Sequence, residues 1–160
     1  MTVTTTPFVA VWEKFVAFTA CASVASAAAQ SPFGPIRETP EGLALFRVLL
    51  TEVITVAKAS GIGLADDVFD RTLSIFMGAP PTHKTSMQRD FERQGRVELE
   101  GTTGTVVRRG REVGVPTPAY DFVYSVLKVL ARPSVDFVNR SEFDSRSQGA
   151  RLSMYRHECP

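Results

Sequence analysis

Apolar positions along the chain gather in long blocks that contain no proline. The prolines stand between these blocks, at Pro7, Pro32, Pro35, Pro40, Pro80, Pro81, Pro116, Pro118 and Pro133. Helices need such proline-free blocks, because a proline inside a helix removes a backbone hydrogen bond and clashes with the preceding turn. No block shows sustained alternation of apolar and polar residues, so strands are not expected. The pattern predicts an all-α domain.

The first block, residues 8–29, is apolar almost all round, which predicts a central helix covered by other helices. Its apolar run FVAFTACASVASAAA, residues 15–29, ends in small residues as a secretory signal does, so a cleaved signal is an alternative. Against this, Glu13 cancels the charge of Lys14, and the run is shorter than the about 20 residues of a bilayer span. A buried helix is the better interpretation.

The next boundaries follow from capping signals. Residues 31–39 contain Pro32, Gly34 and Pro35 and are expected to form a loop. Thr39 can cap a second helix whose first position is Pro40, and Gly61 ends it. A third helix is expected from about Asp66 to the proline pair at 80–81.

Two more helices are expected in the second half of the chain. Residues 101–114 carry four glycines, which we expect to permit close packing on the first helix. Thr117 and Pro118 open a last helix that ends before Pro133. Its predicted inward face comprises Phe122, Val126, Val129 and Leu130.

Length and composition suit one domain with a tail: a helical domain over residues 7–132 and a polar, loosely ordered tail over 133–160. The 44% hydrophobic content is ordinary for a globular protein, and a net charge of +1 offers no electrostatic reason to expect nucleic acid or an anionic membrane. Cys21 and Cys159 lie far apart in sequence, so a disulfide framework is not expected and a reducing cytoplasm is the default location.

Several familiar motifs are excluded. Residues 61–66, GIGLAD, follow a helix rather than a strand and lack the third glycine of a dinucleotide fingerprint. His83 stands alone and His157 lies in the tail, so converging metal ligands are not expected. The basic cluster at 108–111 is most simply a solvated helix face.

Three polar residues have both an ordinary and a functional interpretation. Lys14 interrupts an apolar helix, so either its stem reaches out to solvent or its ammonium faces a cleft and serves as a proton donor. Glu98 is either a carboxylate in the first turn of a helix or a ligand-binding group. Ser86 is either a helix cap or a ligand-binding group. These residues taken singly leave the alternatives open.

Five short motifs together resemble one family. They are WEKFV at 12–16, GPIR at 34–37, TSMQRD at 85–90, ELEG at 98–101 and GVPTP at 114–118. In order and spacing this series is similar to the C-terminal domain of ketopantoate reductases (2-dehydropantoate 2-reductases), over roughly residues 12–130. The resemblance implies a multi-helix domain of the 6-phosphogluconate dehydrogenase C-terminal-like type. It also implies reduction of ketopantoate by NADPH, on the route to pantothenate, in a cleft between this domain and a Rossmann domain.

By this resemblance Lys14 corresponds to the general acid that protonates the ketone oxygen, while Ser86 and Glu98 correspond to residues that hold the substrate. NADPH is expected to bind mainly to a Rossmann domain that this chain does not include, so a missing or separately supplied Rossmann domain is an expected partner. A homodimer stays open.

The sequence departs from the family at positions that usually carry asparagine. One and two turns beyond the lysine stand Phe18 and Ala22, and Thr103 precedes the glycine of the next helix. These departures leave the exact keto acid open. They also motivate a second hypothesis, that the chain is a non-catalytic helical binding or oligomerisation module derived from the same fold.

Overall fold

The structure, a computed structural model, describes residues 7–131, and within that range it contains seven helices and no strand. The helices are α1 (Pro7–Ala27), α2 (Phe33–Glu38), α3 (Pro40–Ala59), α4 (Val68–Gly78), α5 (Ser86–Glu92), α6 (Thr103–Val113) and α7 (Pro118–Leu130). The all-α expectation is confirmed. The predicted tail over 133–160 lies outside the described residues.

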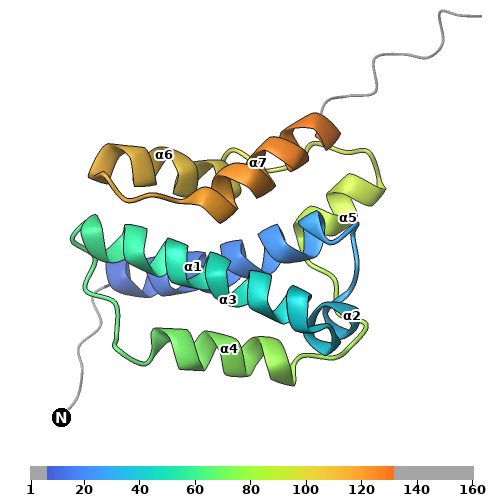
Figure 1. Cartoon of the computed structure of the whole chain (residues 1–160), viewed down its shortest axis with the longest axis horizontal. Coiled ribbons are helices and arrows are strands. Elements are labelled where there is room, and N and C mark those ends of the chain that lie inside the picture. Colours follow the sequence, from blue (N-terminus) through green and yellow to red (C-terminus); the bar gives the residue numbers. More distant parts are fainter. Residues whose placement is uncertain (1–6, 132–160) are drawn as a thin grey trace, which may run out of the picture.

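The helices form three layers (Figure 1). The central layer holds α1 and α3, which pack on each other; α6 and α7 cover one of its faces and α4 the other. The short helices α2 and α5 close one end of the central layer. The proposed site residues come from α1, from α5 and from the turn before α6.

The second half of α1 is the centre of the core. Residues 22–26 are at most 1% exposed, as expected for a covered central helix. The first half differs, because Phe8 and Val11 are exposed by 62% and 65%. By length and composition α1 could also cross a membrane, a test that core helices and signal sequences pass equally.

The segment before α3 is more regular than expected. Residues 31–39 contain α2, whose Phe33 and Ile36 are buried and belong to the core. Gly34 lies so close to the 80–81 turn that an added Cβ would be 2.9 Å from the Cβ of Pro81. The expectation of a loop was wrong, because burial of two apolar side chains one turn apart outweighs the local glycine and prolines.

The helix α3 begins at Pro40, as predicted. Thr39 occupies the N-cap position, as predicted, but its side chain makes no capping bond, because its hydroxyl donates backwards to the carbonyl of Pro35 at 2.9 Å. The predicted start and cap residue were therefore right, and the expected side-chain cap was not.

The predicted inward face of α7 was wrong. Its buried residues are Tyr120, Val123 and Leu127, whereas Phe122 and Val129 are each 70% exposed. The predicted face also included Val126 and Leu130, which are exposed as well.

A buried carboxylate helps to set the orientation of α7. On α3, Glu52 is 9% exposed, and its two carboxylate oxygens accept the backbone N–H groups of Ala119 and Tyr120, each at 3.0 Å. These N–H groups belong to the first turn of α7, where a helix has unsatisfied donors and a positive dipole end. The interaction holds Tyr120 toward the core and thereby turns Phe122 outward.

The glycines of α6 do not serve the packing on α1 that we expected. A Cβ on Gly104 would lie 3.0 Å from Tyr124 of α7, and one on Gly110 would lie 2.9 Å from Thr117. They permit close approach of α7 and of the turn that leads into it. The helix meets α1 instead through a buried hydroxyl pair, Ser23 with Thr103, at 2.8 Å.

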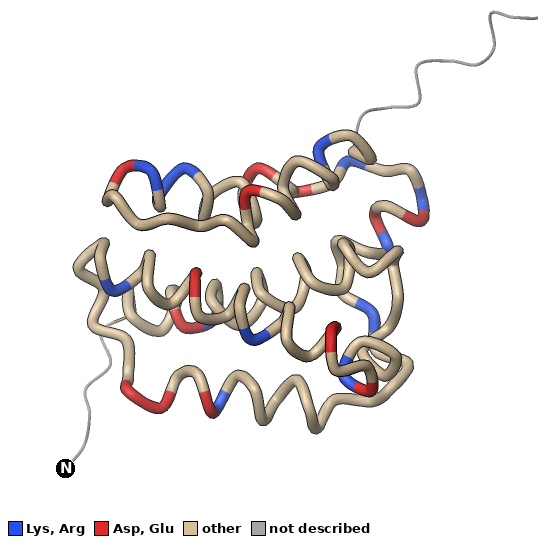
Figure 2. The backbone as a smooth tube through the Cα atoms, viewed as in Figure 1, with Lys and Arg blue, Asp and Glu red and all other residues tan. Residues whose placement is uncertain are grey.

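Charged residues of both signs lie close together along α6 and α7 (Figure 2). Each arginine of the basic cluster has an acidic partner at 3.1 Å or less, namely Arg108 with Glu100, Arg109 with Glu112 and Arg111 with Asp121. All three arginines are exposed, which confirms the interpretation of a solvated helix face.

Candidate functional site

Lys14 lies on the half of α1 that is only partly covered. Its side chain is exposed, and none of the ion pairs formed within residues 7–131 includes it. Its neighbour Glu13, in contrast, is bound to Arg71 of α4 at 2.9 Å. Within the described residues, the ammonium of Lys14 therefore reaches solvent without an ionic partner.

A stripe of residues continues from Lys14 along the same side of α1. Phe18, Cys21 and Ala25 follow it at helical spacings of four, seven and eleven. Phe18 is 38% exposed, Cys21 is half-buried and Ala25 is fully buried. Burial raises the pKa of the Cys21 thiol to about 12, so this thiol is neutral at physiological pH. Ala22, in contrast, is fully buried and offers nothing to a ligand.

The far end of this stripe is covered by α5. Ser86 is the first residue of α5, and the cap is the preceding residue, Thr85. The side chain of Thr85 accepts the N–H of Gln88 at 3.3 Å, and the side chain of Gln88 accepts the N–H of Thr85 at 2.8 Å. The interpretation of Ser86 as a helix cap was therefore wrong. Its side chain is exposed and takes no part in this capping box.

Gln88 is a buried residue that sequence reasoning missed. It is fully buried, and its amide nitrogen donates to the carbonyl of Ser31 at 2.7 Å and to that of Ala25 at 3.5 Å. Its side chain thus binds α5 to the end of α1 and to the loop that follows. The spacing of Thr85 and Gln88 matches a capping box, and this was the signal that could have indicated it.

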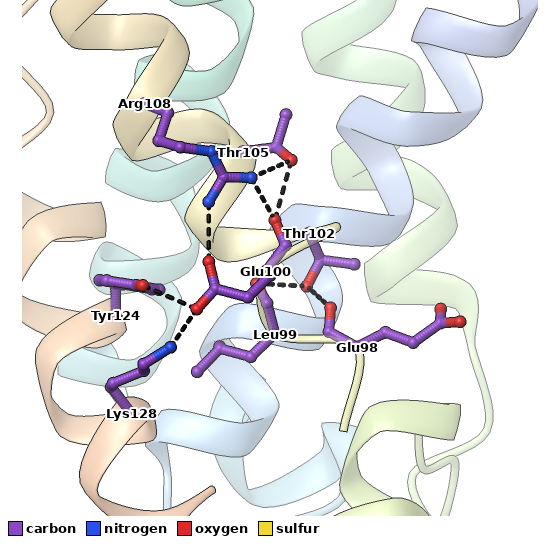
Figure 3. Close-up of polar contacts among 8 residues, drawn as sticks. All are labelled: Glu98, Leu99, Glu100, Thr102, Thr105, Arg108, Tyr124 and Lys128. Carbon is purple, nitrogen blue, oxygen red and sulfur yellow. Dashed lines mark hydrogen bonds and ion pairs between the residues drawn. The ribbon is translucent and has the colours of Figure 1, made fainter. Parts of the chain in front are cut away.

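Glu98 lies in the turn that precedes α6. We had considered it a carboxylate in the first turn of a helix, but α6 begins only at Thr103, so that interpretation was wrong. The Glu98 carbonyl accepts the hydroxyl of Thr102 at 2.8 Å, and its side chain is exposed. Figure 3 shows this side chain extending away from the neighbouring polar cluster.

That cluster is centred on Glu100 (Figure 3). One carboxylate oxygen accepts the hydroxyl of Tyr124 at 2.8 Å and the ammonium of Lys128, and the other accepts Arg108 at 2.7 Å. Arg108 also donates to the Glu100 carbonyl at 2.7 Å. Lys128, then Tyr124 and Arg108, hold the pKa of the Glu100 carboxyl below its usual range. The cluster fastens the turn at 98–101 to both α6 and α7.

The three residues predicted for the site come from α1, α5 and the turn before α6. Lys14, Ser86 and Glu98 are all exposed, and no hydrogen bond or ion pair within residues 7–131 joins any two of them. Within the same range no group of three His, Cys, Asp or Glu residues is placed to hold a metal ion. The structure thus offers three separate exposed polar groups, with an apolar stripe running from Lys14 towards α5.

Comparison with curated proteins finds relatives that share one name. A 2-dehydropantoate 2-reductase of Caulobacter vibrioides is 32% identical over 112 residues, which cover 69% of this chain and 38% of the relative. A 2-dehydropantoate 2-reductase of Halobacterium salinarum is 29% identical over 131 residues, 82% of this chain and 43% of the relative. The chain therefore spans about two-fifths of the length of these relatives.

Solved structures agree with the sequence relatives. The 2-dehydropantoate 2-reductase of Methylococcus capsulatus matches with a TM-score of 0.73 and 31% identity, over 82% of this chain and 45% of that one. A dimeric ketopantoate reductase of Staphylococcus aureus matches with a TM-score of 0.71 and 31% identity, over 77% and 43%. Residues 9–131 also match the family model described as the C-terminal domain of ketopantoate reductase PanE/ApbA. The chain belongs to the ketopantoate reductase family and carries its C-terminal helical domain.

Proposed function

We propose that the chain supplies the substrate-binding and proton-donating side of an NADPH-dependent reductase that converts the ketone of a 2-keto acid, such as ketopantoate, to an alcohol. The observation that carries this proposal is the free, exposed ammonium of Lys14 on the uncovered half of α1, in a domain of this family. Because the chain spans 38% of the Caulobacter relative, we assign cofactor binding to a nucleotide-binding domain outside the matched region.

The chemistry suits a lysine. When bound, NADPH supplies hydride to the carbonyl carbon, and negative charge then grows on the ketone oxygen. The ammonium of Lys14 stabilises that charge and donates the proton that completes the alcohol. The hydroxyl of Ser86 and the carboxylate of Glu98 hold the substrate by hydrogen bonds. Docking of a second domain would remove water from Lys14, which strengthens these electrostatic interactions.

The test uses a fusion protein, in which the full chain follows the part of the Caulobacter vibrioides reductase that precedes the matched region. With NADPH and ketopantoate, Lys14→Ala is expected to lower kcat by about 100- to 10,000-fold, the usual contribution of a general acid. Lys58→Ala is the control, because Lys58 is also an exposed helical lysine but lies at the end of α3. Unchanged turnover in Lys14→Ala would contradict the assigned role.

A second candidate function is self-association. Phe122, Val126 and Val129 form an exposed apolar stripe along α7, and the Staphylococcus aureus relative is dimeric. Large exposed apolar stripes of this kind favour protein interfaces. We expect the chain to form a homodimer that Phe122→Glu converts to monomer in sedimentation velocity, and a monomeric parent would exclude this function. We also propose a cytoplasmic location, in line with the thiol of Cys21, which forms no disulfide within residues 7–131.

A further inference from the structure

We infer that Glu100 is a positioning residue, which fixes the turn at 98–101 so that the carboxylate of Glu98 can accept a hydroxyl group of the substrate. The inference rests on the proposed function, because it takes Glu98 as a group that holds the keto acid. It adds a substrate class, namely keto acids whose side chain carries a hydroxyl.

The first step is what the carboxylate of Glu98 can hold. A carboxylate accepts hydrogen bonds and donates none. The polar groups of ketopantoate are a carboxylate, a ketone and a hydroxyl, and of these only the hydroxyl is a donor. Glu98 therefore holds such a substrate through its hydroxyl, and a keto acid without a donor gains nothing from this contact.

The second step is that the side chain of Glu98 has no support of its own. It is exposed, and none of the hydrogen bonds and ion pairs found within residues 7–131 includes its carboxylate. Figure 3 shows it extending away from the polar cluster around Glu100. The place of the Glu98 carboxylate thus depends on the backbone of the turn that carries it.

The third step is that Glu100, two residues further on, ties this turn to two helices. Its carboxylate accepts Arg108 of α6 at 2.7 Å, the hydroxyl of Tyr124 of α7 at 2.8 Å and the ammonium of Lys128. Arg108 also donates to the backbone carbonyl of Glu100 at 2.7 Å. Within the described range, no other side chain of residues 98–101 forms a hydrogen bond to α6 or α7.

The fourth step is that the turn keeps other contacts when Glu100 is replaced. Leu99 is 2% exposed, and the hydroxyl of Thr102 donates to the carbonyl of Glu98 at 2.8 Å. The side chain of Glu100 is itself 51% exposed, and exposed ion pairs contribute little to stability. Glu100→Ala should therefore fold, with the turn released from α7 and Glu98 displaced rather than removed.

A matched pair of substrates isolates this effect. Ketopantoate and 3,3-dimethyl-2-oxobutanoate have the same carbon skeleton and differ in one hydroxyl. A hydrogen bond to a charged group changes affinity by about 10- to 100-fold. In the parent protein, kcat/KM for ketopantoate should exceed that for 3,3-dimethyl-2-oxobutanoate by about this factor. We call the quotient of these two values the hydroxyl preference.

The experiment uses the same fusion protein, with NADPH and both substrates. Glu98→Ala removes the acceptor and should bring the hydroxyl preference to about 1. Glu100→Ala should lower the preference by about 10-fold through a higher KM for ketopantoate, since misplaced binding groups lose most of their effect. Glu100→Gln keeps an acceptor oxygen and should lie between Glu100→Ala and the parent.

Two further variants control for other causes. Glu112→Ala removes the same charge from α6, where Glu112 is exposed and pairs with Arg109 at 3.1 Å, and it should leave the hydroxyl preference unchanged. Glu98→Ala combined with Glu100→Ala should show no lower preference than Glu98→Ala alone, because residues that act through one contact are not additive. If Glu100→Ala does not fold, Tyr124→Phe, which removes one donor and no charge, carries the same test.

The outcomes separate the two ideas. A hydroxyl preference that Glu100→Ala leaves unchanged, or an equal loss of kcat/KM for both substrates, overturns the inference while Lys14-dependent reduction keeps the proposed function standing. A parent protein without a hydroxyl preference also overturns it. Turnover that does not depend on Lys14, or no turnover while the intact Caulobacter enzyme reduces ketopantoate in the same assay, overturns the proposed function and the inference with it. A preference lowered by Glu100→Ala and kept in Glu112→Ala supports both.

Discussion

Replacement of Gln88 by leucine tests whether one buried amide holds α5 against α1. Leucine has a similar volume, so the apolar contacts of the site are largely retained. What is lost is the acceptor for the N–H of Thr85, at 2.8 Å, and for its hydroxyl, at 3.3 Å, together with the donor to the carbonyl of Ser31, at 2.7 Å. The N-cap bond from the Gln88 backbone to the Thr85 hydroxyl does not depend on the side chain and remains.

The magnitude follows from these contacts. Each short hydrogen bond contributes about 1 kcal/mol net, and each buried partner left unpaired adds a cost of about 1 kcal/mol or more. Thr85 is buried and Ser31 half-buried, so we count a full penalty for Thr85 alone. The bond to the carbonyl of Ala25, at 3.5 Å, is at the limit of bonding and is not counted. Gln88→Leu should therefore lower the free energy of unfolding by about 3 kcal/mol.

Urea unfolding of the full chain, followed by circular dichroism at 222 nm, measures this loss. With a slope of about 1.5 kcal/mol/M, the midpoint should fall by about 2 M without a change in slope. Gln94→Leu is the control, since Gln94 is exposed in the turn after α5 and its substitution should change stability by less than about 0.5 kcal/mol. A loss below about 1 kcal/mol in Gln88→Leu, or an equal loss in the control, would refute the reasoning.

Three further predictions concern ionisable groups. Glu52→Gln should lower the free energy of unfolding by about 2 kcal/mol, because a neutral amide replaces two charge-assisted acceptors at the start of α7; an unchanged urea midpoint would exclude this. In a Cys159→Ser background, iodoacetamide should alkylate Cys21 slowly at pH 9 in the native protein and fast in urea. Burial raises the pKa of this thiol from 9.0 to about 12. The stability that the buried neutral thiol contributes is therefore complete below pH 9 and is lost as the pH rises towards 12. The Glu100 carboxyl, whose pKa is lowered, should titrate below its usual range by NMR, and Lys128→Met should move this titration to higher pH. The stability that ionised Glu100 contributes is present above the pKa of the unfolded state and is lost as the pH falls through the folded pKa.

Helix starts could be predicted from sequence because their signals are local. Pro40 opens α3 and Pro118 opens α7, as their preference for the first helical turn indicates. The buried face of α7 could not be predicted in this way. Most of the circumference of α7 is apolar, so periodicity does not distinguish Phe122 from Tyr120. The choice depends on Glu52, which lies 67 residues earlier in the chain than Ala119, the first of its two partners.

The short helix α2 was missed for a related reason. Its sequence FGPIRE contains glycine and proline, which locally favour a turn. Its stability comes from tertiary contacts, since the ring of Phe33 lies 4.7 Å from that of Phe76 on α4 and the N–H of Gly34 donates to the carbonyl of Pro81 at 2.8 Å. A helix of this length is marginal by itself. Propensity therefore gives the wrong answer wherever burial of a few side chains supplies most of the stability.

The candidate site shows the same division between local signal and tertiary support. Each of its three exposed residues has a close neighbour in sequence whose side chain is fixed by contacts with another element. These pairs are Lys14 with Glu13, Ser86 with Gln88, and Glu98 with Glu100. The neighbour holds the backbone in place, while the site side chain stays free of partners.

That division matches what a binding site requires. A side chain that must contact a ligand cannot be occupied by the fold, yet its backbone has to be held to within a fraction of an ångström for catalysis. Sequence motifs indicated the free residues, and the capping box could have indicated Gln88. The contacts that fix the neighbouring residues had no local signal, because Arg71 of α4 and Tyr124 of α7 are distant in sequence from the residues they hold. These contacts are therefore the part of the candidate site that only a three-dimensional structure can identify, and their loss should misplace Lys14, Ser86 or Glu98 without removing them.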